Sequence, residues 1–340
     1  MSENNTLFSI IVSVYQIENY IGQCIKSLLS QCGIDSEIII IDDGSTDRGG
    51  EIAEEYARKH KCIRIIHQEN KGLSAARNTG IYYAKGKYCI FVDGDDMLCE
   101  GALDSLRNCI ENKQTPEIII HRRKQIDQAG KSKECRYQFN EAVLQSMPIS
   151  KLYTELQKMP DMYMGAWIFT VKTNYLTGNN FYFAEGLFHE DEEWVPKILL
   201  NTRNIAFNNT CFYLYRIGRN GSITTTPNIK RIFDKLKIII LLQKEFKQSK
   251  YSIDIKEIIS ERIRSIYFGI LCNAWQYRKD VKYDKLLKQL TKKNMLLRNS
   301  KRINHKAGYF MIRHVGVRAA CFCLWYTNEI RKQIKKIFQE

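Results

Sequence analysis

The stretch GKYCIFVDGDDML, residues 86–98, decides the fold of this chain and leads to its chemistry. Residues 88–92 are a short apolar run between two glycines, which is typical of a strand buried on both faces. The strand runs into Asp93, Gly94, Asp95 and Asp96. Clustered carboxylates repel one another, so a folded chain normally compensates them with a cation or with hydrogen-bond donors. Oxygen ligands suit Mg²⁺ or Mn²⁺; a solvated acidic turn is the alternative.

Apolar strands and amphipathic helices alternate along the first hundred residues. Strands are predicted at 7–14, 37–41, 62–67 and 88–92, and helices at 18–31, 47–60 and 74–84. This alternation favours an α/β fold with a mostly parallel central sheet flanked by helices. Because ligands bind at the carboxyl ends of such strands, we expect the polar segments 13–16, 42–47 and 93–96 at one edge.

The positive charge of the chain is concentrated in its last third. Residues 228–340 hold 27 Lys and Arg against 9 Asp and Glu, a net charge of +18, whereas residues 1–227 have a net charge of −3. Beyond Pro227 the pattern predicts only basic helices. We therefore expect two domains, 1–226 and 227–340, and an anionic partner for the second: nucleic acid, anionic lipid or a diphosphate.

Residues 309–338 form an amphipathic pattern on a helical wheel. One half holds the apolar residues Met311, Ile312, Val315, Ala319, Phe322, Cys323, Tyr326, Ile330, Ile334 and Ile337. The other half is rich in Lys and Arg, as in helices that lie in a lipid interface. Packing of the apolar half on the rest of the protein is the alternative. No nucleic-acid motif appears, so we expect an anionic membrane surface as partner and no nucleic acid.

The cellular compartment is indicated by the cysteines and the N-terminus. The eleven cysteines are scattered and show no zinc-binding spacing, which is typical of free thiols in a reducing compartment. Residues 1–6 are polar, so no signal peptide is expected, and no apolar run reaches the about 18 residues that would span a bilayer. We expect a cytoplasmic protein, peripheral on the inner face of the cytoplasmic membrane.

Five segments together resemble the family 2 glycosyltransferases of the GT-A fold, particularly bacterial enzymes that build surface polysaccharides. They are FSIIVSVYQIENYIGQCIKSLLSQ (8–31), EIIIIDDGSTD (37–47), NKGLSAARNTGIYYAKGKYCIFVDGDDML (70–98), HEDEEW (189–194) and YRIGRNGSIT (215–224). The resemblance covers roughly residues 7–225. Two positions depart from it: Ser13 stands where the family usually has Pro, and Gln16 where it has Asn.

The resemblance implies a role for each matched residue. The donor-binding residues would be Ser13, Tyr15, Glu18, Asp43, Gly72, Arg77, Asn78 and Asp93. Among these, Asp43 would accept a hydrogen bond from the nucleobase, favouring uracil. Arg77 would pair with phosphate, with a salt bridge as the alternative. Asp95 would ligate the metal, Mn²⁺ or Mg²⁺, together with Asp93. For Asp42 and Asp47 we instead expect turn formation and helix capping.

The segment HEDEEW would supply the catalytic base. Asp191 matches the family's general base, which takes the proton of the acceptor hydroxyl on the side opposite the leaving group. Family 2 is an inverting family, so the resemblance implies inversion. Trp167 and Trp194 either stack on the acceptor sugar or belong to the core. Arg216 is a candidate for a contact with the donor diphosphate.

The resemblance thus implies an inverting, metal-dependent glycosyltransferase that uses a nucleotide-sugar donor, with a UDP-sugar favoured. The acceptor would be a saccharide hydroxyl, linked to a polyprenyl diphosphate, in the synthesis of capsule, O-antigen or exopolysaccharide. Processive members carry a QxxRW segment after the base, and the chain has none, so single addition is expected. The alternative is a catalytically silent sugar-nucleotide-binding protein of the same fold.

Overall fold

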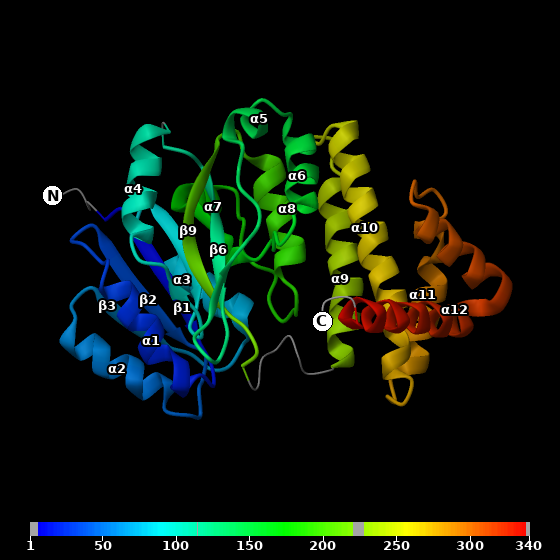
Figure 1. Cartoon of the computed structure of the whole chain (residues 1–340), viewed down its shortest axis with the longest axis horizontal. Coiled ribbons are helices and arrows are strands. Elements are labelled where there is room, and N and C mark those ends of the chain that lie inside the picture. Colours follow the sequence, from blue (N-terminus) through cyan, green and yellow to red (C-terminus); the bar gives the residue numbers. More distant parts are fainter. Residues whose placement is uncertain (1–5, 114, 220–227, 338–340) are drawn as a thin grey trace. The chain divides into compact units, whose positions relative to one another are not determined.

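The computed structural model describes residues 6–113, 115–219 and 228–337, without the side chains of the last three (Figure 1). The chain divides into two compact units, residues 1–225 and 226–340. The sequence predicts that the first domain ends one residue later, at residue 226.

The first unit contains a nine-stranded sheet in its described residues. Its strands are β1 (Phe8–Val14), β2 (Ser36–Asp42), β3 (Ile63–His67), β4 (Tyr88–Asp93), β5 (Met97–Leu98), β6 (Ile118–Ile126), β7 (Ser132–Glu134), β8 (Phe169–Lys172) and β9 (Ile205–Arg216). The helices of this unit are α1 (Glu18–Leu29), α2 (Gly49–Lys59), α3 (Leu73–Tyr83), α4 (Ala102–Asn112), α5 (Glu141–Gln145), α6 (Ile149–Lys158), η1 (Ala166–Ile168), α7 (Thr173–Gly178) and α8 (Asp191–Asn201).

The strands follow the spatial order β3-β2-β1-β4-β8-β6-β9-β5, with β7 beside β6. The first four strands along this order are parallel, as their connecting helices require. Beyond β4 the sheet is mixed, because β8 is antiparallel to both of its neighbours. All seven residues of β1 are buried, which explains why this strand reads as an uninterrupted apolar run. The predicted α/β class and GT-A architecture are confirmed.

Helix α3 lies unusually close to the sheet, and one glycine makes this possible. A Cβ atom at Gly80 would stand 2.2 Å from Cγ2 of Ile11 on β1, which no real side chain tolerates. The close packing of α3 on β1 and β2 buries the face of the helix that carries Arg77. A larger residue at position 80 would therefore force α3 away from β1.

The second unit is helical throughout its described residues, as the sequence predicts. Its elements are α9 (Ile229–Phe246), α10 (Ile253–Ala274), η2 (Trp275–Tyr277), α11 (Tyr283–Lys293), η3 (Asn294–Leu297) and α12 (Ile303–Ile337). Helix α10 packs against both α9 and α12 (Figure 1). Its core includes Ile239, Tyr267, Ile270 and Leu286, which are all fully buried.

The prediction of one continuous helix over 309–338 is wrong. The backbone leaves the helical conformation at Gly316, where φ is +83° and ψ is 161°, so α12 consists of two helical segments. Glycine adopts this conformation without steric cost, and the wheel pattern carries no trace of the break. The buried residues described after the break are Ala320, Cys321 and Leu324, and none of them belongs to the predicted apolar half.

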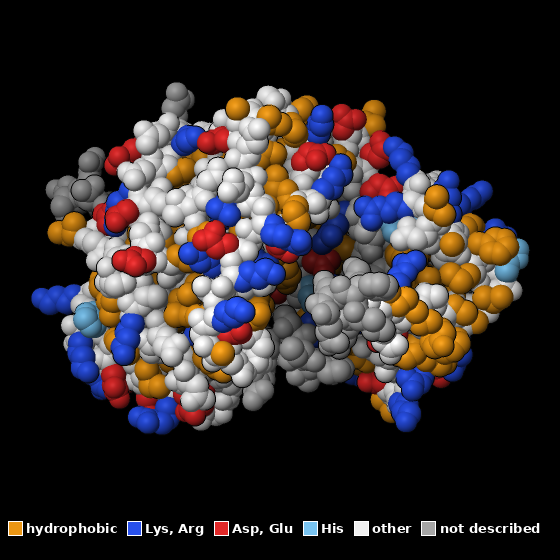
Figure 2. Space-filling model, viewed as in Figure 1, with side chains coloured by type: hydrophobic (Ala, Val, Ile, Leu, Met, Phe, Trp, Pro, Cys, Tyr) orange, Lys and Arg blue, Asp and Glu red, His pale blue; other side chains and the backbone are white. Residues whose placement is uncertain are grey.

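None of the described helices is both long and apolar enough to cross a membrane. All eleven cysteines are free thiols, as their scattered spacing predicts. Acidic and basic side chains are interspersed over the face of the molecule that Figure 2 shows.

Candidate active site

The carboxyl ends of β1, β2 and β4 lie side by side. Val14 pairs with Asp42 on β2, and Ser13 pairs with Asp93 on β4. The three polar segments that follow these strands therefore occupy one edge of the sheet, as predicted.

Asp43 organises the loop that leads into α3. Its Oδ1 accepts hydrogen bonds from Nε2 of Gln68 (2.7 Å) and from the amide of Lys71 (2.9 Å). Its Oδ2 accepts a bond from the amide of Gly72 (2.7 Å), which has a φ of +88° that glycine tolerates best. A carboxylate has about four acceptor positions, so Asp43 keeps one for a ligand. The predicted contact to a nucleobase would use that position.

Two acidic residues of the same edge build turns, as expected. Oδ1 of Asp42 accepts a bond from the amide of Ser45 (3.0 Å). Asp47 accepts bonds from the amides of Gly49 (3.0 Å) and Glu18 (2.8 Å). The carboxylate of Glu18, predicted to line the nucleoside pocket, accepts a bond from the amide of Arg48 (3.0 Å) and so ties α1 to this loop.

Three serine hydroxyls around this edge are buried and have no hydrogen-bond partner among the described residues: Ser13, Ser45 and Ser74. They come from β1, from the loop after β2 and from the first turn of α3. Unpaired buried hydroxyls are costly and are normally satisfied by a ligand or water. Beside them, Tyr15 is 48% exposed and presents an aromatic surface. These features fit a polar ligand with an aromatic ring, such as a nucleoside.

Arg77 is the centre of the site. Its side chain is 2% exposed and contacts three carboxylates: Asp93 (2.8 Å), Glu190 (2.5 Å) and Asp191 (3.6 Å). Burial lowers the pKa of Arg77, but these negative charges outweigh burial and raise it. The guanidinium is thus permanently charged and paired through both of its terminal nitrogens. It joins the acidic turn after β4 to the start of α8, although these segments are about a hundred residues apart in the sequence.

Asn78 also bridges distant segments. Its side chain exchanges hydrogen bonds with both backbone groups of Phe183 (2.9 Å each) and donates one to Glu185 (3.1 Å). These bonds hold the segment before HEDEEW against α3. Arg77 and Asn78, which match donor-binding positions of the family, thus form these hydrogen bonds with other residues of the protein.

Asp191 is the first residue of α8, and only one of its oxygens is engaged. Oδ1 accepts a bond from the amide of Ala166 (3.1 Å) and faces Arg77, whereas Oδ2 has no partner among the described residues. Burial and the charge of Glu190 raise the pKa of Asp191 well above its usual range, and Arg77 lowers it in part. A carboxylate with a raised pKa and one free oxygen has the properties of a general base.

Residues of β9 hold the acidic turn that follows β4. Asp96 is buried and accepts bonds from the hydroxyl of Tyr213 (2.8 Å) and the amide of Arg216 (2.7 Å). Arg216 also donates to the backbone carbonyl of Asp95 (2.9 Å). Arg216, a candidate for the donor diphosphate, is therefore engaged with this turn. Residues 220–224 of its motif lie outside the described part of the chain.

Asp95 forms an ion pair with Arg219, which lies just after β9. Burial and the charge of Asp93 raise the pKa of Asp95, and Arg219 lowers it in part. A cationic partner therefore relieves the repulsion between the two carboxylates. Nothing in the sequence distinguishes Arg219 from Arg216 for this contact.

The residues around Asp93 and Asp95 fit a divalent metal held jointly with a nucleotide. In the described residues, no group of three or more His, Cys, Asp or Glu gathers to bind a metal. Mg²⁺ and similar ions are commonly held by one or two carboxylates together with substrate phosphates, which requires no such group. The mutual repulsion of the two carboxylates supplies the negative potential that this mode of binding needs.

Two tryptophans considered for sugar stacking belong to the core. Trp167 is 3% exposed and Trp194 is fully buried, so neither offers a free ring face. Tyr163, which no pattern in the sequence singles out, stacks on Trp167 (centroids 5.8 Å apart) and is 49% exposed. Trp167 directly follows Ala166, whose amide binds Asp191, so this tyrosine lies near the candidate base. Partial burial and the charge of Asp191 raise the pKa of the Tyr163 hydroxyl.

The predicted site residues converge through α3. Asp43 binds the amide of Gly72 at the start of this helix, and Arg77 one turn later binds both Asp93 and Asp191. The candidate nucleobase, metal and base positions are thus linked by direct contacts within the first unit.

Comparison with known proteins connects this geometry to a family. Residues 9–179 match the family described as "Glycosyl transferase family 2". YibD of Escherichia coli, named an uncharacterized glycosyltransferase, is 30% identical over 263 residues, which are 72% of each chain. EpsJ of Bacillus subtilis, also named an uncharacterized glycosyltransferase, is 52% identical over 108 residues. That match spans 32% of this chain and only 31% of EpsJ.

Solved structures show the same fold. Staphylococcus aureus TarS 1–349 in complex with UDP-GlcNAc superposes with a TM-score of 0.70 at 17% identity, over 95% of this chain and 92% of TarS 1–349. The mannosyltransferase PcManGT of Pyrobaculum calidifontis, solved with GDP-Man and Mn²⁺, superposes with a TM-score of 0.53 at 13% identity, over 95% and 86% of the two chains.

Proposed function

This chain belongs to glycosyl transferase family 2 and is a glycosyltransferase, and we propose that it is an inverting, metal-dependent enzyme that adds a single sugar from a UDP-sugar. The observation that carries the proposal is the position of Arg77, which contacts the candidate metal ligand Asp93 and the candidate base Asp191. An inverting transfer needs these two groups on opposite sides of one reacting carbon.

The proposed mechanism assigns each role to an observed contact. Asp191 takes the proton of the acceptor hydroxyl through Oδ2, while the amide of Ala166 and Arg77 fix Oδ1 and the orientation of the carboxylate. Asp43 and the unpaired hydroxyl of Ser13 bind the nucleoside. A divalent ion on Asp93 and Asp95 would stabilise the charge of the departing UDP as a Lewis acid. The Mn²⁺ bound to PcManGT and the UDP-GlcNAc bound to TarS support this choice of ligands.

The half-exposed ring of Tyr163 suggests where the acceptor sugar lies. It is backed by Trp167, which follows the residue whose amide binds Asp191, so it offers an apolar surface near the base. Aromatic rings stack well on the apolar faces of sugars. We assign Tyr163 to the acceptor side of the site.

The test is release of UDP from a panel of UDP-sugars, with and without Mn²⁺. We expect metal-dependent release that Asp95→Ala abolishes and that the matched control Asp104→Ala leaves intact. Asp104 is a surface residue of α4 whose side chain is 81% exposed. UDP binding without turnover of any donor would instead identify a silent nucleotide-binding protein.

We also propose that the enzyme attaches peripherally to the inner face of the cytoplasmic membrane and uses a polyprenyl-diphosphate-linked acceptor in surface-polymer synthesis. The second segment of α12 supports attachment, because Phe322, Tyr326, Ile330 and Ile334 are spaced four residues apart and all at least 40% exposed. The side chain of Arg331, between two of them, is exposed as well. An exposed apolar stripe with a basic neighbour matches an anionic lipid surface.

Vesicle co-sedimentation tests this attachment. With vesicles containing phosphatidylglycerol, Phe322→Asp combined with Ile330→Asp should release the protein into the supernatant. Ile240→Asp is the matched control, since Ile240 on α9 is 51% exposed but lies outside the stripe. Equal sedimentation of both variants and the parent would contradict attachment through α12.

A further inference from the structure

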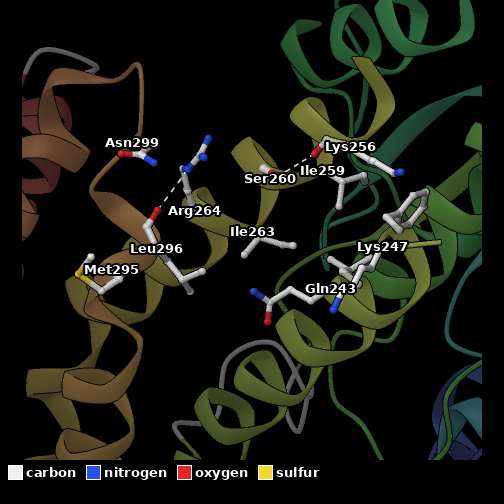
Figure 3. Close-up of a pocket in the computed structure, with 12 residues that line it drawn as sticks. Gln243, Lys247, Lys256, Ile259, Ser260, Ile263, Arg264, Met295, Leu296 and Asn299 are labelled. Atoms are coloured by element: carbon white, nitrogen blue, oxygen red, sulfur yellow. Dashed lines mark hydrogen bonds between the residues drawn. The ribbon is translucent and has the colours of Figure 1, made fainter. Parts of the chain in front are cut away.

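The helical unit contains a pocket that none of the proposed catalytic or donor-binding residues lines. It lies between the end of α9, the first half of α10 and η3, and has a volume of about 450 Å³ (Figure 3). Small-molecule sites typically have volumes of roughly 300–1,000 Å³. The pocket is therefore large enough to hold part of a ligand of its own.

The inner surface of the pocket is apolar. Leu242 and Phe246 of α9 and Ile259 and Ile263 of α10 line it, and each is at most 5% exposed. Figure 3 shows Ile263 between Ile259 and Leu296 of η3. This part of the lining can accommodate a hydrocarbon group.

The charged residues of the pocket are all basic, and they stand beside the uncharged polar residues Gln243, Ser260 and Asn299. Lys247 and Lys256 line it, and neither has an acidic partner among the described residues. The charge of Arg264, a third basic residue of the lining, is balanced by Glu261 at 2.6 Å. The twelve described lining residues include no Asp or Glu. Two uncompensated ammonium groups beside an apolar surface create a local positive potential that attracts an anion.

We propose that this pocket binds one lipid phosphate, that is, a phosphate monoester of a hydrocarbon chain. The chain would lie on the surface formed by Phe246 and Ile263, and the phosphate would pair with Lys247 and Lys256. A neutral chain would leave the ammonium groups unused, and free phosphate would leave the apolar surface exposed to water. The combination selects a ligand with both parts.

This inference goes beyond the proposed function, because binding in the pocket requires neither donor nor transfer. It also differs from the proposed attachment through α12, which concerns an extended lipid surface and not a single lipid molecule. The two can be separated by using soluble amphiphiles in place of vesicles.

The test is calorimetric titration of the full-length protein with three probes: decyl phosphate, decyl maltoside and inorganic phosphate, the amphiphiles below their micelle concentrations. We expect saturable one-to-one binding of decyl phosphate and at least about tenfold weaker binding of the other two probes. Decyl maltoside tests the apolar surface alone, and inorganic phosphate tests the basic residues alone. Equal affinity for decyl phosphate and either other probe would overturn the proposal, as would no binding of decyl phosphate.

Two variants place the binding in this pocket. Lys247→Glu combined with Lys256→Glu should weaken binding of decyl phosphate at least about tenfold. The control Lys244→Glu combined with Lys288→Glu makes the same charge change at exposed lysines outside the pocket and should change affinity less than about twofold. Ser260→Phe fills the pocket without changing charge and should also abolish binding. Equal losses in both double variants, or full binding by Ser260→Phe, would refute the assignment.

Discussion

The buried position of Arg77 yields the sharpest prediction, concerning Arg77→Met. The guanidinium is 2% exposed and contacts Asp93, Glu190 and Asp191. Methionine keeps much of the apolar volume but leaves the carboxylates without their cation. Removing one partner of a buried ion pair costs about 3–5 kcal/mol of stability. In a unit of this size 1 kcal/mol corresponds to roughly 2–4 °C, so we expect the melting temperature to fall by about 6–20 °C.

The loss of stability in Arg77→Met should depend on pH, and its sign follows from Asp191. The folded-state pKa of this group is raised above its unfolded value, and Arg77 opposes the increase. Without Arg77 the folded pKa rises further. At a pH between the pKa values of Asp191 in the unfolded and the folded protein, the folded protein binds a proton that the unfolded protein does not. The stability of the fold therefore increases as the pH falls through the folded-state pKa. The deficit relative to the parent should therefore be smaller near pH 5 than near pH 8.

Differential scanning calorimetry at both pH values measures this effect. Arg48→Met is the control, because Arg48 also pairs with a carboxylate, Glu51, but both side chains are about 70% exposed. Arg48→Met should lower the free energy of unfolding by no more than about 1 kcal/mol. Arg77→Lys keeps the charge but not the forked geometry, so its melting temperature should lie between those of the parent and Arg77→Met. If Arg77→Met melts no lower than Arg48→Met, the role of Arg77 as the buried centre of the site is refuted.

Three further predictions concern the ligands. Arg219→Gln removes the cation from Asp95 and should tighten binding of Mn²⁺ to the nucleotide-free protein by about three- to tenfold, measured by electron paramagnetic resonance titration. Tyr163→Ala should raise the KM for the acceptor by about tenfold while leaving hydrolysis of the donor within about twofold. Asp191→Asn should lower the rate of sugar transfer by about 10²–10⁴-fold with UDP binding retained. In the parent enzyme, the transfer rate should fall with decreasing pH at a pH above the usual carboxyl range, because the pKa of Asp191 is raised.

Each of these has a contrary outcome. Unchanged Mn²⁺ affinity in Arg219→Gln would mean that the ion pair with Asp95 does not compete with metal. A Tyr163→Ala variant that loses donor hydrolysis and transfer equally would place this ring on the donor side. An acid limb at the ordinary pKa of a carboxyl group would argue against Asp191 as the base.

The predictions from sequence were accurate where the signal is local. The strands β1, β2, β3 and β4 and the helices between them lie within about two residues of their predicted limits, because apolar runs and helical periodicity depend on neighbouring residues. The prediction of one continuous helix over 309–338 was wrong at Gly316, because a single glycine can end a helix without altering the apolar periodicity on either side. The roles of Trp167 and Trp194 also stayed open, because sequence does not show burial.

The sequence by itself determined the α/β class, the residue types at the end of each strand and the basic helical last third, because these follow from local patterns of polarity. Only the tertiary structure decided that Arg77 joins Asp93 to Asp191, that Arg219 rather than Arg216 pairs with Asp95, and that Tyr163 is the exposed ring beside the base. These contacts join residues that lie far apart along the chain. Which of several equivalent side chains meets a given carboxylate depends on the order of the strands in the sheet, which no local pattern encodes.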